Sequence, residues 1–320
     1  MRPANPILSC NRGQTVMKTD SQPFPVKTRD IHNHHMDSTV WDEFRFRPDD
    51  VIIATYAKSG TTWTQQIVGQ LVFGGAAHVP IHDLSPWVDL RVPPKDVKLA
   101  ALEAQTNRRY VKTHLPVDAL VFSPEAKYIY LGRDGRDVLW SLYNHHAKTN
   151  ALWYQVLNET PDRVGPAIER VDCFVVDYFQ TWLERDGYPF WSFWENIVSW
   201  WSVRDLPNVL LLHYDELKRD MPGGIRRIAS FLDIPIDEAA FPRIVEHCSF
   251  DYMKANADEA APLGGALWEG GGKTFIHKGT NGRWREELPE TLGRAYEERA
   301  LAELGPDCAQ WLRGGSKPDV

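Results

Sequence analysis

Residues 51–62, which read VIIATYAKSGTT, decide the fold. They begin with a short apolar run that follows the turn at residues 47–50, the pattern of a strand buried on both faces of a parallel sheet. Small and hydroxyl-bearing residues come next, and apolar residues then recur at positions 63, 67, 68, 71 and 72, which is a helical period. The stretch therefore predicts a strand, a tight loop and a helix in succession.

Two further strand–helix units stand later in the chain. Residues 127–131 and 209–214 are apolar runs of strand length, and helical patterns follow them at residues 138–143 and 225–232. Repeated units of this kind predict an α/β fold, with a central parallel sheet flanked by helices. We expect a single domain over residues 26–320, preceded by a disordered polar lead over residues 1–25.

The composition narrows the functional classes. The net charge of −7 disfavours binding to nucleic acid or to an anionic membrane surface. The four cysteines are far apart and lack CxxC spacing, so we expect neither a zinc site nor a disulfide scaffold, and we favour a cytoplasmic location. No apolar run approaches the length of about 18 residues that would suggest membrane insertion.

The loop that follows the first strand carries the chemistry. A helix N-terminus presents free N–H groups and a positive dipole end to an anion. Lys58 adds a cation, Ser59, Thr61 and Thr62 add hydroxyls, and Gly60 permits close approach of the backbone. A capped helix start is the plain alternative.

The loop departs from the nucleotide-binding pattern GxxxxGK[ST], because Lys58 precedes Gly60 and no second glycine stands upstream. This order disfavours a Mg²⁺-dependent kinase-like phosphotransferase, which remains an alternative. A non-catalytic nucleotide-binding module is the other alternative.

Residues 55–63, TYAKSGTTW, resemble the 5′-phosphosulfate loop TYPKSGTTW of the cytosolic sulfotransferase family, with Ala57 in place of proline. Residues 127–143, KYIYLGRDGRDVLWSLY, are similar to the segment of that family that grips the nucleotide 3′-phosphate. The resemblance implies that Arg133 and Ser141 hold that phosphate. It also implies 3′-phosphoadenosine 5′-phosphosulfate (PAPS) as the donor, without a metal.

Two C-terminal segments extend the resemblance. Residues 275–284, FIHKGTNGRW, look like the RKGxxGDW region, in which His277 stands where the family has arginine and is followed by Lys278 and Gly279. Residues 248–256, CSFDYMKAN, are similar to TSFxxMKxN, with Cys248 in place of threonine. By this resemblance Phe250 and Trp63 sandwich the adenine. Tyr214 resembles a residue near the adenine, although core packing explains it equally well.

Residues 110–116, YVKTHLP, supply a candidate base. They resemble the KTHLP segment of the family, in which the histidine accepts the proton of the acceptor hydroxyl. Lys112 and His114 alternate at a strand end and therefore share one side. The resemblance implies direct in-line transfer, in which Lys58 and Lys112 neutralise charge and Ser141 holds Lys58 back until an acceptor arrives.

The acceptor is less well defined, and we expect a small apolar or aromatic hydroxyl compound. Phe190, Trp194, Ile197 and Trp201 have the spacing of one helix face. Core packing is the favoured interpretation of these residues, and a wall of the acceptor pocket is the alternative. The sequence leaves the oligomeric state open.

Two histidine clusters receive no functional role. The segment 31–35, IHNHH, has no carboxylate or cysteine at a regular spacing, so we expect an exposed helix or loop start rather than a metal site. His145 and His146 are expected at an exposed helix end.

Overall fold

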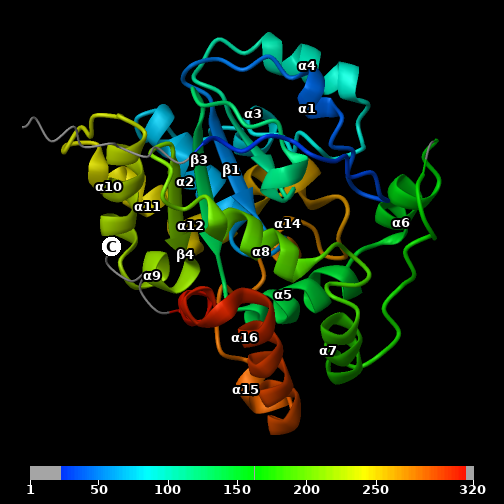
Figure 1. The fold of residues 1–320 in the computed structure, drawn as a ribbon. Helices are drawn as coiled ribbons and strands as arrows, with labels where there is room; N and C mark the ends of the chain where they lie inside the picture. The colour runs from blue at the N-terminus through cyan, green and yellow to red at the C-terminus, as the bar shows by residue number, and fades with distance from the viewer. Residues whose placement is uncertain (1–22, 162, 315–320) are drawn as a thin grey trace, which may run out of the picture.

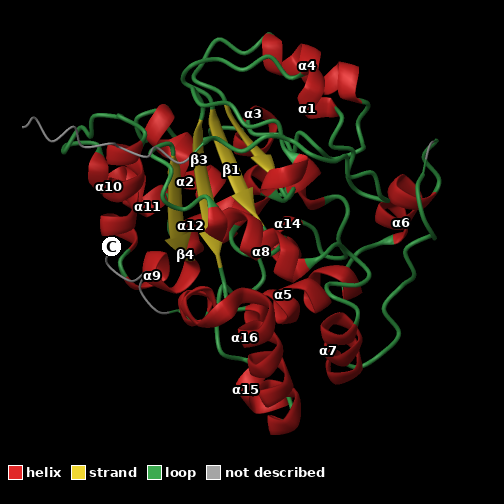
Figure 2. Ribbon diagram, viewed as in Figure 1, coloured by secondary structure: helices red, strands yellow, loops and turns green. Residues whose placement is uncertain are grey.

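The computed structural model describes residues 23–161 and 163–314. Its central sheet has four parallel strands in the order β2-β1-β3-β4. The strands are β1 (Val51–Thr55), β2 (Tyr110–Thr113), β3 (Lys127–Gly132) and β4 (Val209–His213). Helices surround the sheet (Figures 1 and 2). The predicted α/β class is confirmed, and the three strands expected from the sequence are found within one residue of their expected ends.

The helices follow the strands in the pattern that the sequence predicts, with several short helices added in the connections. Their bounds are α1 (Val40–Glu43), α2 (Thr61–Val72), α3 (Ile81–Leu84), α4 (Lys95–Glu103), η1 (Val117–Ala119), α5 (Gly135–Ala147), α6 (Ala151–Asn158), α7 (Val175–Glu184), α8 (Phe193–Ser202), α9 (Tyr214–Arg219), α10 (Met221–Phe231), α11 (Phe241–His247), α12 (Phe250–Ala255), α13 (Ala257–Ala260), η2 (Pro262–Gly265), α14 (Gly272–Phe275), α15 (Trp284–Glu287) and α16 (Glu290–Leu312).

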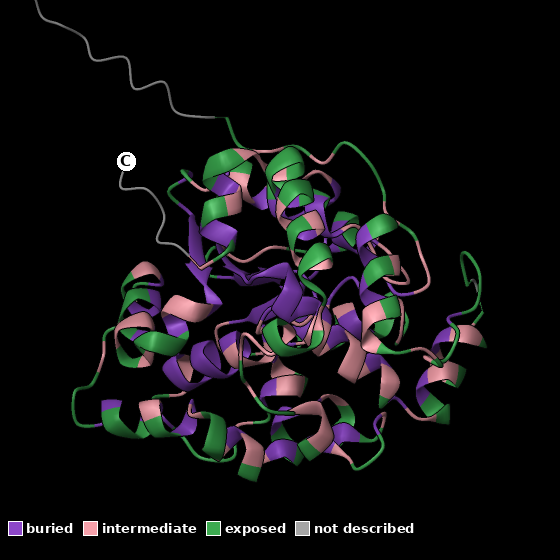
Figure 3. Ribbon diagram, turned by 90° about the horizontal axis from the view of Figure 1, so that it is seen from below, coloured by how far each residue is buried: buried purple, intermediate pink, exposed green. Residues whose placement is uncertain are grey.

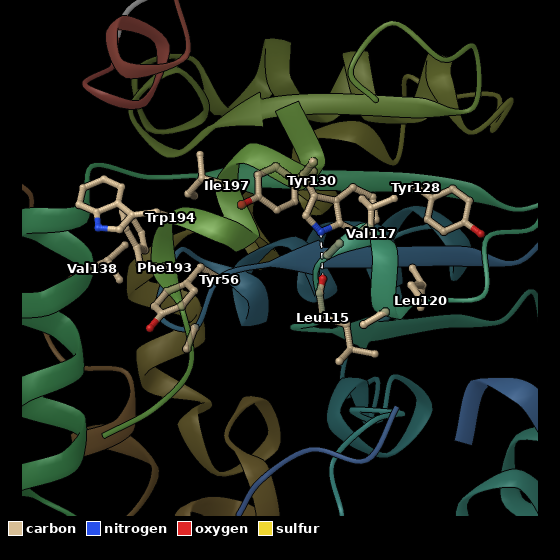
Figure 4. Packing of buried hydrophobic residues seen from close by; sticks show 14 of the residues in the cluster. Tyr56, Leu115, Val117, Leu120, Tyr128, Tyr130, Val138, Phe193, Trp194 and Ile197 are labelled. Carbon is tan, nitrogen blue, oxygen red and sulfur yellow. Dashed lines mark hydrogen bonds between the residues drawn. The ribbon is translucent and has the colours of Figure 1, made fainter. Parts of the chain in front are cut away.

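Both faces of the sheet are buried, because alternate strand residues enter two different hydrophobic clusters. Val51 and Ile53 pack in the cluster that contains α2, α10 and α11. Ile52 and Ala54 pack in the larger cluster, with residues of α5, α8 and α16. Figure 3 shows the strands buried at the centre of the molecule, and Figure 4 shows part of the larger cluster, including Tyr130 and Ile197. The continuous apolar runs of the sequence therefore reflect a sheet covered on both sides.

The turn from β1 into α2 is built on Gly60. This glycine has φ 111° and lies immediately before α2. A Cβ at this position would come within 2.8 Å of Leu131 and 2.9 Å of Tyr214. Glycine is therefore required here both by conformation and by space. Lys58 also adopts a positive φ of 66°, in the left-handed region that is uncommon for a residue other than glycine.

The histidine expectations were wrong in part. Segment 31–35 is a loop, as expected, but His35 is only 5% exposed. His146 is buried at the end of α5, where its Nε2 lies 3.0 Å from the carbonyl oxygen of Glu169. His145 is half-buried and lines a cavity. Polar helix ends are usually solvated, but here the segment between α6 and α7 covers the end of α5.

The expectation that residues 190, 194, 197 and 201 form one helix face was wrong for Phe190. Trp194 and Ile197 lie in the core on α8, as the favoured interpretation holds, and Trp201 packs partly buried against it. Phe190 precedes the helix, and its N–H donates to the carbonyl of Gly187 at 2.9 Å. It lines the cavity instead, as the alternative interpretation proposed.

Most of the expected N-terminal lead lies outside the described residues. From residue 23 onward the chain is described, and Phe24 stacks on Phe122 with the ring centroids 6.1 Å apart. Among the residues that the structure describes, no helix combines the length and the apolarity needed to cross a membrane.

We expect Gly132→Ala, at the end of β3, to lower the free energy of unfolding by about 1–3 kcal/mol. A methyl group there would overlap the ring of Trp311, which is 1% exposed and has no room to move. Urea denaturation followed by circular dichroism measures the effect. Gly293→Ala in α16 is the matched control, since nothing lies within 4 Å of its added methyl. Equal stability of the two variants would contradict the packing argument.

Candidate active site

A cavity of about 1000 Å³ lies where the carboxyl ends of the strands meet. Parallel strands all deliver their C-terminal loops to one edge of the sheet, and ligands bind there in open α/β folds. The cavity brings together every site residue predicted from the sequence except Ser59. These are Lys58, Gly60, Thr61, Thr62, Trp63, Lys112, His114, Arg133, Ser141, Tyr214, Phe250, His277, Lys278 and Gly279.

Ser59 differs from its neighbours. Its side chain is fully buried and is not part of the cavity wall, and its N–H donates to the carbonyl of Tyr56 at 3.2 Å. Its hydroxyl has no hydrogen-bond partner in the part of the chain that the structure describes. The expected contribution of this hydroxyl to anion binding is therefore not supported by its position.

Lys58 projects into the cavity. Its Nζ lies 3.3 Å from Nδ1 of His145 and 4.5 Å from the ring centroid of Phe275. Burial, together with the charges of Arg133 and Lys112, lowers the pKa of Lys58 to about 7. The partner of Lys58 in this structure is thus His145 and not Ser141, which the family resemblance had suggested.

Arg133 connects two loops of the cavity. Its guanidinium donates to the carbonyl of Lys58 at 2.9 Å and to Oδ1 of Asn281 at 3.1 Å, and it lies 4.2 Å from the ring centroid of Tyr214. Sequence reasoning missed Asn281, whose only signal is its place inside the motif at residues 275–284. Arg133 thereby holds the loop after β1 against the segment at residues 275–284.

Aromatic rings line the same end of the cavity. The rings of Trp63 and Tyr214 lie 5.4 Å apart, and the indole N–H of Trp63 donates to the carbonyl of Cys248 at 2.8 Å. Phe250 is 39% exposed, and Gly279 lies so close to it that a Cβ would come within 2.7 Å. The Cys248 side chain is buried in the core, and this burial raises the pKa of its thiol. Position 248 therefore contributes its backbone to the site.

The segment at residues 275–284 forms an exposed rim of the cavity. The carbonyl of His277 accepts from Nζ of Lys254 at 2.5 Å, and the carbonyl of Gly279 accepts from Nζ of Lys218 at 2.6 Å. Partial burial, together with the charges of Arg283 and Lys278, lowers the pKa of His277. A histidine at this position therefore carries less positive charge at neutral pH than an arginine would.

His114 has the geometry of a general base. Its Nδ1 lies 2.7 Å from the carbonyl oxygen of Thr55, which can only accept, so Nδ1 carries the proton and Nε2 keeps a lone pair. Burial, with a smaller contribution from the charges of Lys112 and Lys58, lowers its pKa to about 3. The ring is therefore neutral at pH 7, as a base must be before it accepts a proton.

Lys112 and His114 both line the cavity, in agreement with their expected common side. Burial lowers the pKa of Lys112 to about 8, whereas the charge of Asp89 opposes this shift. Asp89, a residue that sequence reasoning missed, is fully buried and accepts from the indole N–H of Trp87 at 2.7 Å. The ring of Trp87 in turn packs edge-on against His114 at 4.6 Å.

The far end of the cavity is aromatic and apolar. The ring of Trp191 stacks on His114 at 5.6 Å, and Trp87, Trp153 and Phe190 complete the wall. The cavity thus joins a cationic end at the loop after β1 to an aromatic end, with His114 between the two. Within the described ranges, no group of three or more His, Cys, Asp or Glu side chains is placed to hold a metal ion.

Comparison with known proteins agrees with this arrangement. The sulfotransferase domain family matches residues 48–305. A glycolipid sulfotransferase of Mycobacterium bovis is 30% identical, with 92% of this chain and 97% of that protein covered. Mouse sulfotransferase 1B1 is 32% identical, with 80% and 83% covered. A retinol dehydratase solved with retinol and PAP has a TM-score of 0.65 and 27% identity, with 83% and 84% covered.

The fold and the comparisons define a group-transfer enzyme with an anion-binding loop after its first strand. The chain belongs to the sulfotransferase domain family, and it is a PAPS-dependent sulfotransferase. The kinase-like and non-catalytic alternatives raised by the sequence are thereby set aside.

We expect the affinity for adenosine 3′,5′-bisphosphate (PAP) to fall as the pH rises from about 7 to about 9. The free protein loses the proton of Lys58 through a pKa of about 7, and an anion favours the charged form, so binding above that pH requires proton uptake. One proton taken up reduces affinity by up to about tenfold per pH unit. Phosphate groups, with a second pKa of about 6, stay ionised throughout this range.

Isothermal titration calorimetry across this range tests the pH dependence. Lys58→Arg keeps a permanent charge and should flatten the curve. Lys112→Met removes one of the two other cavity lysines, Lys98 and Lys112, that titrate in this window near a pKa of about 8. The same slope in Lys58→Arg as in the wild type would refute the assignment to Lys58.

Arg133→Ala should weaken binding of PAP by about 10- to 100-fold, the range for losing a hydrogen bond to a charged group. Binding of adenosine 5′-monophosphate should weaken much less, because it lacks the 3′-phosphate. Since Arg133 also holds the carbonyl of Lys58, the ratio of the two dissociation constants is the informative quantity. Equal weakening of both ligands would reject a contact to the 3′-phosphate.

Proposed function

We propose that this enzyme transfers the sulfuryl group of PAPS to a hydroxyl of a small, apolar or aromatic acceptor, with His114 as the general base. The observation that carries the proposal is the lone pair of His114 Nε2 in one continuous cavity, between a cationic end and an aromatic end. The cationic end suits a donor with several negative charges, and the aromatic end suits an apolar alcohol or phenol.

The residues at the cationic end fit such a donor. Lys112 is buried and Lys58 is half-buried, and neither forms an ion pair with a carboxylate among the described residues. Desolvation is the main cause of their lowered pKa values, and the charge of Asp89 only partly opposes it at Lys112. Buried charges of this kind call for a counter-ion. In our assignment the loop at residues 58–62, without Ser59, holds the 5′-phosphosulfate.

The rest of the donor is assigned in the same way. Arg133 and Ser141 hold the 3′-phosphate, and the adenine lies near Trp63, Phe250 and Tyr214. His277, Lys278 and Gly279 close over the phosphates from the exposed rim. Each of these residues contributes to the wall of the same cavity, which supports the assignment.

The reaction proceeds by in-line displacement at sulfur. Nε2 of His114 takes the proton of the acceptor hydroxyl while the oxygen–sulfur bond forms, and the bond from sulfur to the bridging phosphate oxygen breaks. Lys58 and Lys112 neutralise the charge that develops on the bridging and sulfonyl oxygens. The products are a sulfate ester and PAP, and the proton leaves on His114.

The names of the relatives support an acceptor with a large apolar part. The mycobacterial relatives are glycolipid sulfotransferases, and one structural neighbour was solved with retinol. The aromatic end of this cavity, with Trp87, Trp153 and Trp191, offers the contact area that such a part needs.

His114→Ala should reduce the rate of sulfuryl transfer by about 10²- to 10⁴-fold, the usual contribution of a general base. PAP affinity in the same variant, measured by calorimetry, should stay near the wild-type value, because the base contacts the acceptor rather than the donor. Labelled PAPS with a panel of alcohols and phenols measures the transfer. Turnover near the wild-type rate would eliminate His114 as the base.

A further inference from the structure

His35 lies inside the aromatic end of the cavity. It is 5% exposed, and its ring is surrounded by those of Trp87 at 6.1 Å, Trp153 at 5.8 Å, Phe190 at 5.4 Å and Trp191 at 5.8 Å. It also contributes to the cavity wall. The mechanism above gives it no task, although a buried imidazole in an apolar box is an unusual choice of residue.

A chain of hydrogen bonds fixes which nitrogen of His35 carries the proton. Nε2 of His34 lies 2.7 Å from the carbonyl oxygen of Pro189, so it must donate, and the neutral ring of His34 then has a lone pair on Nδ1. Nδ1 of His35 lies 2.6 Å from that atom and must donate to it. His35 therefore keeps a lone pair on Nε2.

Both rings are neutral. Burial lowers the pKa of His34 and lowers that of His35 well below its ordinary value. The charged forms of His34, His146, His114 and Arg91 add to this lowering, and His145 also lies close enough to His35 for their charges to interact. A second proton on His35 is therefore disfavoured, and its Nε2 remains a hydrogen-bond acceptor.

The backbone holds this acceptor in place. The N–H of His35 donates to Oδ1 of Asn33 at 2.9 Å, and its carbonyl accepts from the N–H of Arg91 at 2.6 Å. The same Asn33 oxygen accepts from the N–H of Met36 at 2.8 Å. His35 is thus anchored at its backbone and at Nδ1, while Nε2 has no hydrogen-bond partner within the described residues.

We propose that His35 is a specificity-determining residue of the acceptor site, and that its Nε2 accepts a hydrogen bond from a second hydroxyl or N–H group of the acceptor. The preferred acceptor is then an apolar or aromatic molecule with two donor groups, one for Nε2 of His114 and one for Nε2 of His35. The inference rests on the proposed function, which needs only the first of these groups. A site built to bond a hydroxyl discriminates strongly against the analogue that lacks it, because its own polar atom is left unpaired.

The test compares β-naphthol with the isomeric dihydroxynaphthalenes, using labelled PAPS. In the wild type, kcat/KM for at least one dihydroxy isomer should exceed that for β-naphthol by about tenfold or more. His35→Phe keeps an aromatic ring but removes the acceptor, so it should abolish this preference. His35→Gln places an amide oxygen near the position of Nε2 and should restore part of it. A preference that survives in His35→Phe, or that is absent from the wild type, would overturn the inference.

His146→Gln is the matched control, because both ring nitrogens of His146 already lie near protein oxygens, 3.3 Å from the hydroxyl of Tyr178 and 3.0 Å from the carbonyl of Glu169. Its preference should equal that of the wild type. Ring-¹⁵N NMR of the wild-type protein adds a test independent of turnover, in which His35 should show a protonated Nδ1 and an unprotonated Nε2. A protonated Nε2 would overturn the inference.

A binding measurement separates this inference from the proposed function. Tryptophan fluorescence of the PAP complex reports binding of each naphthol without any transfer. Preferential binding that depends on His35, but without sulfated product, would refute the proposed function and leave the hydrogen bond standing. Transfer without a preference that depends on His35 would refute this inference alone. Neither binding nor transfer with any naphthol would refute both.

Discussion

The concentration of positive charge at the ends of the parallel strands is the constraint on which the site depends. Lys58 and Lys112 lie in the same cavity, and burial lowers the pKa values of both. Two of the cationic side chains are held in place by neighbours: Arg133 donates to the carbonyl of Lys58 and to Asn281, and Nζ of Lys58 lies 3.3 Å from Nδ1 of His145. The arrangement is costly without a ligand, and an anionic donor relieves the cost, so that donor binding and charge compensation become one event.

The same geometry helps to keep the ring of His114, between the cationic and the aromatic ends of the cavity, neutral. His114 lies close enough to Lys112 and Lys58 for their charges to lower its pKa, in addition to the larger effect of burial. The cationic end therefore adds to the effect of burial in keeping His114 unprotonated, which the proposed role as a base requires. Donor site and base are thus coupled through electrostatics over the short span of one cavity.

The sequence predicts the sheet and the phosphate loop well, because strands that are buried on both faces appear as continuous apolar runs such as Val51–Thr55. Phe190 was misplaced because it fits the spacing of the following helix. The available signal was Ser192, whose Oγ accepts from the N–H of Glu195 at 3.1 Å and starts α8 after Phe190. His35 and His145 could not have been found, because their place in the cavity wall depends on segments far away in the chain, whereas Asn281 had a weak signal in its motif. The roles of the individual site residues remain predictions.

Two imidazoles in the cavity share one tautomer through different means. His114 donates from Nδ1 directly to the carbonyl of Thr55, whereas His35 reaches the carbonyl of Pro189 through His34. In both cases a backbone carbonyl, which can only accept, determines that the Nε2 atom keeps its lone pair. The two Nε2 atoms are hydrogen-bond acceptors, so each of them suits a ligand group that donates. The preference for donor groups that we propose for these two atoms therefore follows from the backbone carbonyls as much as from the two histidines.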